Sequence, residues 1–456
     1  MKVINRIELV KNGQTPHIRK CRSLAIKCLE HVVNAVDPQQ MVRRAVKVEN
    51  GFLTVENKTF DLNKFKHVYV LGGGKASGAM AKAIEEILGK HLTAGIVNVP
   101  YGAPRTTRLI KINEVRHPIP DEAGVKGTMN IMELAQQANE NDLVICLISG
   151  GGSSLMPLPR PGVSLEDKQA ITSLLLKSGA PIVEVNAVRK HLSDFKGGWL
   201  AKKAFPATVL NLFLSDVIGD SLEAIASGPT VPDTTTFNQA IKVLKKHNLW
   251  SAAPHSIRGI LLKGSRGLID ETPKPHDAAF KKVSHIIIGN NRTATLAATD
   301  WLTRKGVSTL LLSRSLEGEA REVGQAFAKF SIEAFGCTTR IERPFAIIAG
   351  GETTVTVMGQ GLGGRNQELA LSVALQLYKN DDCVFASFST DGVDGPTDAA
   401  GAIADTYTMQ RAEILGLNAL DSLKMNDSYH FFLGLGDLII TKATGTNVND
   451  ILVFVG

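Results

Sequence analysis

Short apolar runs that end abruptly in glycine or small polar residues recur along the chain. The run at 144–148 is followed by serines and three glycines, and the run at 68–71 is followed by three glycines and a lysine. Continuous apolar runs of this length are typical of strands buried on both faces, as in parallel sheets. The segment at 78–88 that follows has apolar residues at helical spacing. This alternation predicts an α/β protein whose first half contains a parallel sheet.

A second set of apolar runs occupies the other half of the chain, at 286–288, 309–312, 345–349 and 384–388. The segment at 353–358 alternates apolar and polar residues, which predicts an antiparallel strand and therefore a mixed sheet. At 456 residues the chain is too long for one ordinary core. Glycines and prolines among charges near 263–276 mark a composition shift. We therefore predict two α/β domains, at 1–270 and 271–456.

The net charge of +7 comes from basic residues that are spread along the chain. There is no basic run with interleaved aromatic residues, so a nucleic-acid partner is not expected. The charge excess either suits anionic small substrates or has no functional meaning. The sequence has no apolar stretch of membrane-spanning length and no cleavable signal segment, so we expect a cytoplasmic protein without a membrane partner.

The five cysteines form no Cys-x-x-Cys pair. Cys21 and Cys28 lie seven residues apart in an expected helix, and Cys146 and Cys383 lie in apolar runs; the fifth is Cys337. Such positions predict reduced, buried thiols rather than a disulfide framework or a zinc site.

The two glycine-rich loops of the first half are candidates for anion binding. Glycines at the end of a strand let backbone amides approach an anion, and the following helix directs further amides at it. The loop at 72–77 is neither a Walker A loop nor a dinucleotide fingerprint, because Ala76 follows the lysine and Ser77 replaces the third glycine. Lys75 is either a phosphate ligand or a surface charge. The loop at 149–154 is either a binding loop or a tight turn.

The stretch at 359–364 formally matches G-x-G-x-x-G. The acid expected to bind a ribose has no equivalent, because Asp381 precedes the next apolar run and Asp391 lies too far along the chain. Arg365 at the start of the next helix suits a phosphate or carboxylate clamp.

Several polar residues follow apolar runs or lie in charged segments. Asp216 and Asp391 are candidates for Mg²⁺ binding, with helix capping and turn formation as the alternatives. His117 in an Arg-His-Pro turn is either a ligand or a cap. Arg189 and Lys196 are predicted to share a helical face, which is functional or merely solvated.

The motifs together resemble the type II glycerate kinases, also called the MOFRL family. The resemblance extends over roughly 18–453. The motifs that carry it are GGGKAS at 72–77, RHPIPDEAG at 116–124, LISGGGSSL at 147–155, VRKHLSDFKGG at 188–198, LSDVIGD at 214–220, IASGPTVPD at 225–233, GGETTV at 350–355, GLGGRNQELA at 361–370, STDGVDGPTDAAG at 389–401 and TGTNVNDI at 444–451.

This resemblance implies phosphorylation of D-glycerate at its 2-hydroxyl by ATP, in two α/β domains with a Rossmann-like first domain and an active site in the cleft. The family's catalytic lysine and arginine fall on Lys75 and Arg365. If these cations come from different domains, closure would bring both to the transferring phosphoryl group, with Mg²⁺ as the bridging ion. The alternative activity is an NAD(P)-dependent hydroxypyruvate reductase, and the chain is expected to be a monomer or homodimer.

The predicted site residues fall into three groups. Those expected to be catalytic are Lys75 and Arg365; those expected to bind the nucleotide, phosphate or substrate are Gly73, Gly74, Ser149, Gly150, Gly151, Gly152, Ser153, Asn290, Gly363 and Gly364; those considered for the metal are Asp216, Glu352 and Asp391.

Overall fold

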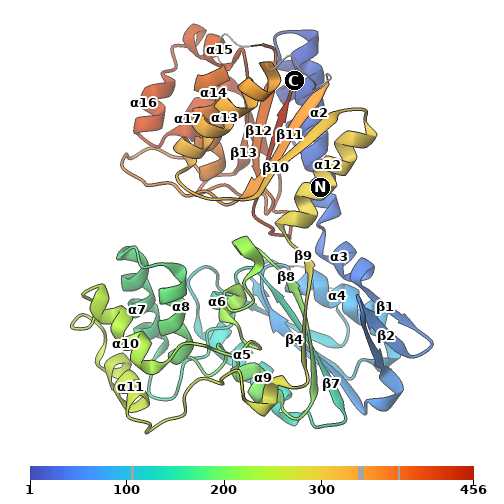
Figure 1. Ribbon diagram of the computed structural model, residues 1–456, viewed down its shortest axis with the longest axis vertical. Coiled ribbons are helices and arrows are strands. Elements are labelled where there is room, and N and C mark those ends of the chain that lie inside the picture. Colours follow the sequence, from blue (N-terminus) through green and yellow to red (C-terminus); the bar gives the residue numbers. More distant parts are fainter. Residues whose placement is uncertain (104–106, 337–343, 378–380) are drawn as a thin grey trace. The chain divides into compact units, whose positions relative to one another are not determined.

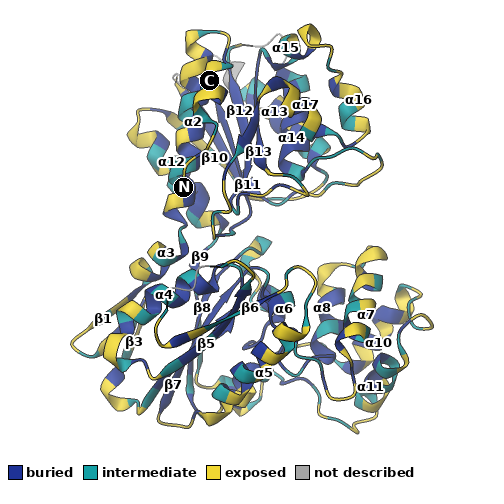
Figure 2. Ribbon diagram, turned by 180° about the vertical axis from the view of Figure 1, so that it is seen from behind, coloured by how far each residue is buried: buried dark blue, intermediate teal, exposed yellow. Residues whose placement is uncertain are grey.

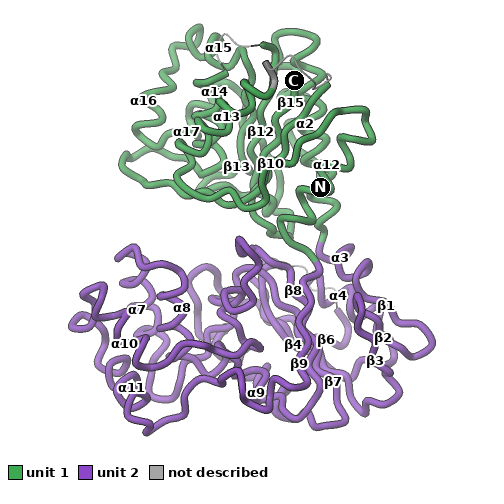
Figure 3. Tube along the Cα trace, viewed as in Figure 1, with its two compact units in different colours: residues 1–37, 289–456 green, residues 38–288 purple. Residues whose placement is uncertain are grey.

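The computed structural model describes residues 1–456 except 104–106, 337–343 and 378–380 (Figure 1). The chain forms two compact units, unit 1 of residues 1–37 and 289–456 and unit 2 of residues 38–288 (Figure 3). Each unit is an α/β structure, as predicted. The division differs from the predicted boundary at 270/271, because the last strand of unit 2 follows that position and the first 37 residues pack within unit 1.

Unit 2 is built on a six-stranded sheet with the order β6-β5-β4-β7-β8-β9. Its strands are β4 (His67–Gly73), β5 (Ala94–Pro100), β6 (Ile110–Val115), β7 (Asp142–Ser149), β8 (Thr208–Leu214) and β9 (Val283–Gly289). The pairs from β6 to β8 are parallel, and every residue of β7 is buried. This is the 3-2-1-4-5-6 order of a doubly wound Rossmann sheet, in which ligands bind where the order reverses. The reversal lies between β4 and β7, the two strands that precede the glycine-rich loops.

Unit 2 also contains several helices and a small three-stranded antiparallel sheet. They are α3 (Pro38–Ala45), α4 (Ser77–Leu88), α5 (Glu122–Gln137), α6 (Gly152–Leu155) and α9 (Trp199–Ala204), with the antiparallel strands β1 (Val46–Glu49), β2 (Phe52–Val55) and β3 (Lys58–Asp61). The helix α4 buries Met80, Ile84 and Leu88, the stripe that helical spacing predicts. Short 3₁₀ turns connect elements at Leu62–Lys64, Gly89–His91, Ile218–Asp220, Ile225–Ser227 and Ala278–Phe280.

Four further helices of unit 2 form a separate hydrophobic core beside the sheet. They are α7 (Leu165–Lys177), α8 (Ile182–His191), α10 (Phe237–Lys246) and α11 (His255–Ser265). Figure 2 shows their buried residues facing one another and their outer faces exposed. Ser164 caps α7, because its side chain accepts a hydrogen bond from the amide of Asp167. Since α8 ends at His191, Lys196 lies in the turn beyond it, and the predicted shared helical face of Arg189 and Lys196 does not form.

Unit 1 contains a mixed six-stranded sheet with the order β10-β11-β15-β12-β13-β14, as predicted. Its strands are β10 (Ser308–Leu316), β11 (Phe345–Gly351), β12 (Val384–Ser389), β13 (Ala399–Asp405), β14 (Leu438–Ile440) and β15 (Asp450–Val455). Only β10 and β11 pair in parallel. The sequence predicts a strand at 353–358, but within the described part of the chain this segment makes only an isolated bridge, between Thr354 and Glu319.

The helices of unit 1 come from both ends of the chain. They are α1 (Arg6–Lys11), α2 (Pro16–Ala35), α12 (Asn291–Arg304), α13 (Ala320–Gly336), α14 (Arg365–Leu377), α15 (Thr408–Ile414), α16 (Ala419–Lys424) and α17 (Ser428–Leu435). Arg22 on α2 is fully buried, with Nε 2.6 Å from Asp405 and Nη1 2.7 Å from Asp437. A buried arginine needs such partners, so this ion-pair cluster explains why the amino-terminal segment folds into unit 1.

Cys21, Cys28, Cys146 and Cys383 are free, buried thiols, as predicted, whereas Cys337 lies outside the described residues. Burial raises the pKa of Cys146 to about 12, which keeps it protonated and unreactive. Among the described helices, none has the length and apolar character that crossing a membrane requires.

Candidate active site

The two glycine-rich loops of unit 2 are joined to each other by hydrogen bonds. The amide of Lys75 donates to the carbonyl of Gly150 at 2.8 Å, and the amide of Ala76 donates to Ser149 Oγ at 3.0 Å. This contact follows from the parallel register, in which Gly73 on β4 lies opposite Ile148 on β7. The two loops therefore form one continuous surface at the reversal point of the sheet.

Three ionisable side chains meet the backbone of the second loop. A Cβ on Gly150 would lie 2.0 Å from Asp216 Oδ2, and one on Gly151 would lie 2.9 Å from His117 Nε2 and 3.3 Å from Lys75 Cγ. Gly151 also has a φ of +78°, which disfavours any other residue. Lys75, His117 and Asp216 thus surround these two glycines; we call this arrangement the glycine-loop site.

The other predicted glycines and serines of these loops pack closely. A Cβ on Gly74 would lie 2.1 Å from Ser149 Oγ, and one on Gly73 would lie 2.9 Å from Met156 Sδ. A Cβ on Gly152 would lie 2.8 Å from the Cβ of Ala226. There is thus no room for a side chain at these glycines unless the loops change shape.

Ser153 and Ser227 share a 2.8 Å hydrogen bond between their hydroxyls, and Ser227 donates onward to Asn186. This short chain of hydrogen bonds joins α6 to α8. It connects the glycine-loop site to the helical part of unit 2.

Arg365, at the start of α14 in unit 1, is held by two carboxylates. Its Nε lies 2.5 Å from Asp450 Oδ2, its Nη2 lies 2.9 Å from Asp450 Oδ1, and its Nη1 lies 2.8 Å from Glu352 Oε1. Burial disfavours the charged guanidinium, but Asp450 and Glu352 outweigh it and raise the pKa of Arg365. Burial raises the pKa of the Glu352 carboxyl, and Arg365 opposes that shift. Arg365 is therefore a permanent, electrostatically compensated cation.

Gly363 and Gly364, which precede Arg365, have packing roles. A Cβ on Gly364 would lie 2.3 Å from Asp394 Cγ, and one on Gly363 would lie 2.3 Å from Ser428 Oγ. The carboxylate of Asp394 accepts hydrogen bonds from the amides of Asn366 at 3.0 Å and Gln367 at 2.9 Å. A phosphate at this helix start would compete with that carboxylate. The environment thus differs from the phosphate loop that the sequence predicts.

Two more predicted site residues have capping roles. Asn290 accepts from the amide of Thr293 at 3.1 Å in a capping box that starts α12. Asp391 accepts from Ser389 Oγ at 2.9 Å and from the amide of Val393 at 3.1 Å, as in a turn.

The predicted metal ligands belong to different units, with Asp216 in unit 2 and Glu352 and Asp391 in unit 1. Within the described ranges there is no group of three or more His, Cys, Asp or Glu residues that could hold a metal ion. In enzymes that bind nucleotides, Mg²⁺ is commonly coordinated by one or two carboxylates together with oxygens of the substrate phosphates. Asp216, against the backbone of Gly150, fits that simpler donor set.

The sequence does not predict the roles of two acidic residues, one beside Arg365 and one at the start of α14. Asp450 holds Arg365, and Asp394 caps α14. Asp450 is the first residue of the last strand and follows a polar segment. In the sequence, a single acid at such a position cannot be distinguished from an ordinary turn residue. Only its place in the middle of the sheet brings it to Arg365.

Glycine-rich loops at the reversal point of a parallel sheet, with a lysine beside them, are features of α/β proteins that bind anionic ligands. Comparison with known proteins agrees with this class and narrows it. Residues 24–262 match a domain of unknown function, DUF4147, and residues 345–450 match the MOFRL family.

A protein of Thermotoga maritima named D-glycerate 2-kinase is 42% identical, over 95% of this chain and 97% of its own. A solved structure described as glycerate kinase from Thermotoga maritima superposes with a TM-score of 0.83 at 41% identity, covering 95% of this chain and 98% of that one. A protein of Agrobacterium vitis named putative hydroxypyruvate reductase is 39% identical over 92% of this chain and 94% of its own. The chain therefore belongs to the MOFRL-containing glycerate kinase family.

Proposed function

We propose that this protein transfers the γ-phosphoryl group of ATP to the 2-hydroxyl of D-glycerate and so produces 2-phosphoglycerate. The relative named D-glycerate 2-kinase, aligned along nearly the whole of both chains, supports the substrate and the position of transfer. The observation that carries the proposal is the glycine-loop site, where Lys75 lies against Gly151 at the reversal point of the parallel sheet.

Phosphoryl transfer requires positive charge around the transferring group and an aligned hydroxyl rather than covalent catalysis by the protein. In our proposal Lys75 stabilises charge on the phosphoryl oxygens, and backbone amides at Gly150 to Gly152 hold a neighbouring phosphate. We further propose that His117, whose Nε2 lies 2.9 Å from the position of a Cβ on Gly151, orients the acceptor hydroxyl. Arg365 remains our second catalytic cation, and its carboxylate partners then position its guanidinium.

A divalent cation, for which Mg²⁺ is our proposal, would neutralise charge between the phosphates when bound. Asp216 is the residue of the glycine-loop site that would hold it, because its carboxylate oxygen lies against the Gly150 backbone. Glu352 is a weaker choice, since one of its oxygens pairs with Arg365 and the other accepts from Asn449 Nδ2 at 2.7 Å.

The reductase alternative requires a dinucleotide site, and the only stretch with the expected fingerprint is at 359–364. Asp394 occupies the helix start where the pyrophosphate would bind. The kinase therefore explains the described residues better. Cytoplasmic location and a monomeric or homodimeric state remain our expectations from the sequence.

The deciding experiment incubates the protein with D-glycerate and Mg-ATP and identifies the product by ³¹P and ¹³C NMR. We expect 2-phosphoglycerate, with L-glycerate as the control acceptor and hydroxypyruvate with NADH as the control for reduction. Formation of 3-phosphoglycerate would contradict the position of transfer. NADH oxidation without phosphorylation would contradict the kinase itself.

A further inference from the structure

A cavity of about 820 Å³ lies beside the glycine-loop site, entirely within unit 2. Gly151, Ser153 and Ser154 form one part of its wall. Lys168 from α7, Arg189 from α8 and Lys196 from the turn after α8 also line it. We call these three residues the cation cluster.

Among the described residues, no salt bridge joins a member of the cation cluster to a carboxylate, although Glu166 also lines the cavity and Asp194 favours the charged form of Lys168. Lys168 Nζ donates to the carbonyls of Pro157 at 3.1 Å and Leu158 at 3.2 Å, and Lys196 Nζ donates to the carbonyl of Met156 at 2.6 Å. The Arg189 side chain forms neither a hydrogen bond nor a salt bridge with the described residues. The nearby acid, Asp194, pairs instead with Arg160, at 3.2 Å.

Burial of uncompensated cations is unfavourable. Lys168 is 6% exposed and Lys196 is 1% exposed. Burial, followed by repulsion from Arg189, lowers the pKa of Lys168 to about 7. Burial, followed by repulsion from Lys168 and Arg189, also lowers the pKa of Lys196 well below its usual value. An anionic ligand would reduce this cost, because it would favour the charged state of both lysines.

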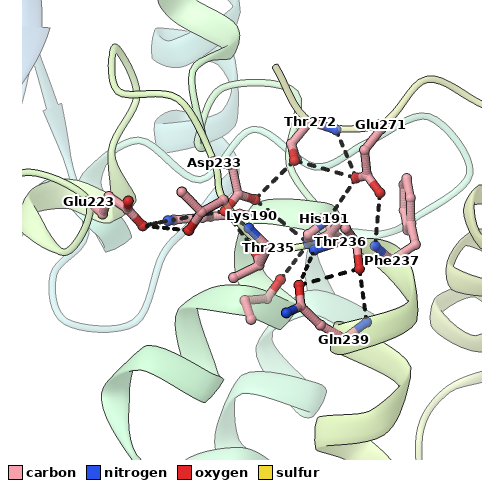
Figure 4. A network of polar contacts seen from close by, with 12 residues as sticks. Lys190, His191, Glu223, Asp233, Thr235, Thr236, Phe237, Gln239, Glu271 and Thr272 are labelled. Atoms are coloured by element: carbon pink, nitrogen blue, oxygen red, sulfur yellow. Dashed lines mark hydrogen bonds and ion pairs between the residues drawn. The ribbon is translucent and has the colours of Figure 1, made fainter. Parts of the chain in front are cut away.

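The next two residues of α8, Lys190 and His191, both have acidic partners. The lack of a salt bridge at Arg189 is therefore not shared by the other basic residues at this end of the helix. Lys190 lies 3.4 Å from Asp233, and His191 Nε2 lies 2.8 Å from Glu271 Oε1 (Figure 4). Asp233 in turn accepts from Thr272 at 3.0 Å. This network holds the end of α8 in place, and Arg189, which takes no part in it, lines the cavity.

The rest of the cavity wall combines apolar residues with polar ones, among them Glu166, Gln169 and Lys177. Pro118, Ile119 and Pro120 form one side, and Leu176 from α7 contributes as well. Ile119 and Leu176 are each 59% exposed. A volume of this size falls in the range of roughly 300–1,000 Å³ that holds drug-sized ligands. A small hydroxy acid would leave most of it unfilled.

We propose that this cavity binds the nucleoside triphosphate, with its phosphates at the cation cluster and its base against Ile119 and Leu176. A triphosphate carries several negative charges and therefore suits such a cluster of basic side chains better than the single charge of a glycerate carboxylate. The cavity also reaches Gly151, whose backbone lies against Lys75, so a terminal phosphate at Gly151 would be beside the catalytic lysine. This inference rests on the proposed function, because a phosphoryl donor must lie next to Lys75.

Isothermal titration calorimetry of the whole protein tests the proposal with three probes: the ATP analogue AMP-PNP, inorganic tripolyphosphate and D-glycerate. We expect Arg189→Met and Lys196→Met to weaken AMP-PNP and tripolyphosphate by roughly 10- to 100-fold. D-glycerate affinity should stay within about twofold. Lys242→Met, which removes an exposed cation from α10, is the matched control and should change none of the three.

Ser173→Trp tests the apolar part, since Ser173 lines the cavity on α7. A bulky side chain there should weaken AMP-PNP and leave tripolyphosphate unchanged. Arg189→Met removes no hydrogen bond, so its melting temperature should equal or exceed that of the wild type and show that it folds. Loss of D-glycerate binding with unchanged AMP-PNP would make the cavity an acceptor site and overturn the proposal, as would unchanged binding of all probes.

The two proposals fail separately. If the wild type does not phosphorylate D-glycerate but Arg189→Met weakens AMP-PNP, the proposed function fails and the nucleotide site stands. If D-glycerate is phosphorylated and Arg189→Met binds AMP-PNP as tightly as the wild type, the function stands and the nucleotide site fails.

Discussion

The two units treat their candidate cations in opposite ways. In unit 1, Arg365 contacts Asp450 through two nitrogen–oxygen pairs and Glu352 through a third. In unit 2, Lys168 and Lys196 donate only to backbone carbonyls, and Arg189 has no polar partner among the described side chains and carbonyls. The first cation is compensated by the protein, whereas the cation cluster requires a ligand to be compensated.

This difference indicates two roles: Arg365 is a cation held in position by the protein, whereas the cation cluster is suited to binding an anionic ligand. A compensated cation has a fixed geometry and contributes to stability, because removing it leaves carboxylates without a counter-charge. An uncompensated, buried cation reduces stability and is retained where a ligand supplies the missing charge. The two groups should therefore respond in opposite directions when they are mutated, in stability as well as in activity.

The largest expected effect is on turnover. Lys75→Ala should lower kcat by roughly 100- to 1,000-fold, the usual effect of removing one group that stabilises transition-state charge. A coupled assay of ADP formation with D-glycerate measures it. Lys66→Ala, which removes an exposed lysine just before β4, should retain wild-type turnover. Normal kcat in Lys75→Ala would exclude it as the catalytic cation.

The second effect contrasts the two cation groups directly. Arg365→Met should destabilise unit 1 by about 2–3 kcal/mol, because Asp450 and Glu352 would repel each other, with partial exposure reducing the loss. Arg189→Met should leave stability unchanged or increased. Urea unfolding of both variants provides the comparison, and equal losses in the two would contradict it.

The loss in Arg365→Met should also depend on pH. Burial and Asp450 already raise the pKa of Glu352, and loss of the opposing guanidinium would raise it further above the unfolded value, so stability should fall as pH increases through the unfolded pKa. The deficit should therefore be smaller at pH 5 than at pH 8. The Asp450→Asn, Arg365→Met double variant should show a weaker dependence on pH than Arg365→Met alone.

A smaller effect concerns the metal. Asp216→Asn should raise the Mg²⁺ concentration for half-maximal rate by roughly tenfold, since the amide lacks the negative charge that favours the ion. AMP-PNP affinity measured without Mg²⁺ should not decrease. An unchanged Mg²⁺ requirement would show that Asp216 does not bind the metal and that another carboxylate does.

The smallest effect is a pH dependence of nucleotide affinity. Lys168, with a pKa of about 7, faces Arg189, Lys196 and Asp194. Above that pH binding must take up a proton, so AMP-PNP affinity should fall about threefold to tenfold per pH unit. Lys168→Met should bind more weakly, and its affinity should depend less on pH; an unchanged slope would exclude Lys168 as the titrating group.

The same lysine affects stability in a defined direction. Its folded pKa of about 7 lies below the ordinary value of 10.5, so the unfolded chain binds more protons between the two. Stability of the ligand-free protein should therefore increase with pH across that window, as far as this group determines it. Lys168→Met should lose this contribution.

Much of the fold could be predicted because its signals are local. Buried strands such as β7 appear as uninterrupted apolar runs, and α4 appears as a stripe at helical spacing. The segment at 353–358 shows the limit of such signals, because alternation alone does not supply a partner strand. The place of β15 between β11 and β12 also lacks any local signal.

The candidate site was predictable to a similar extent. The glycine loops and Lys75 lie directly after strands, so their meeting follows from the parallel order of the sheet. Asp450 at Arg365 and Asp394 at α14 depend on residues far apart in sequence. A charged helix such as α8 looks the same in sequence whether its arginine is solvated or faces a cavity.

The sequence by itself determined the α/β class, the two glycine loops and Lys75, and its motifs indicated the family. These depend on neighbouring residues, which the chain order specifies. The tertiary structure decided which charges are compensated. Arg22 pairs with Asp405 and Asp437, and Arg365 pairs with Asp450, whereas the cation cluster forms no salt bridge with the residues that the structure describes. Electrostatic compensation depends on distance in space, and only folding brings distant segments within that distance.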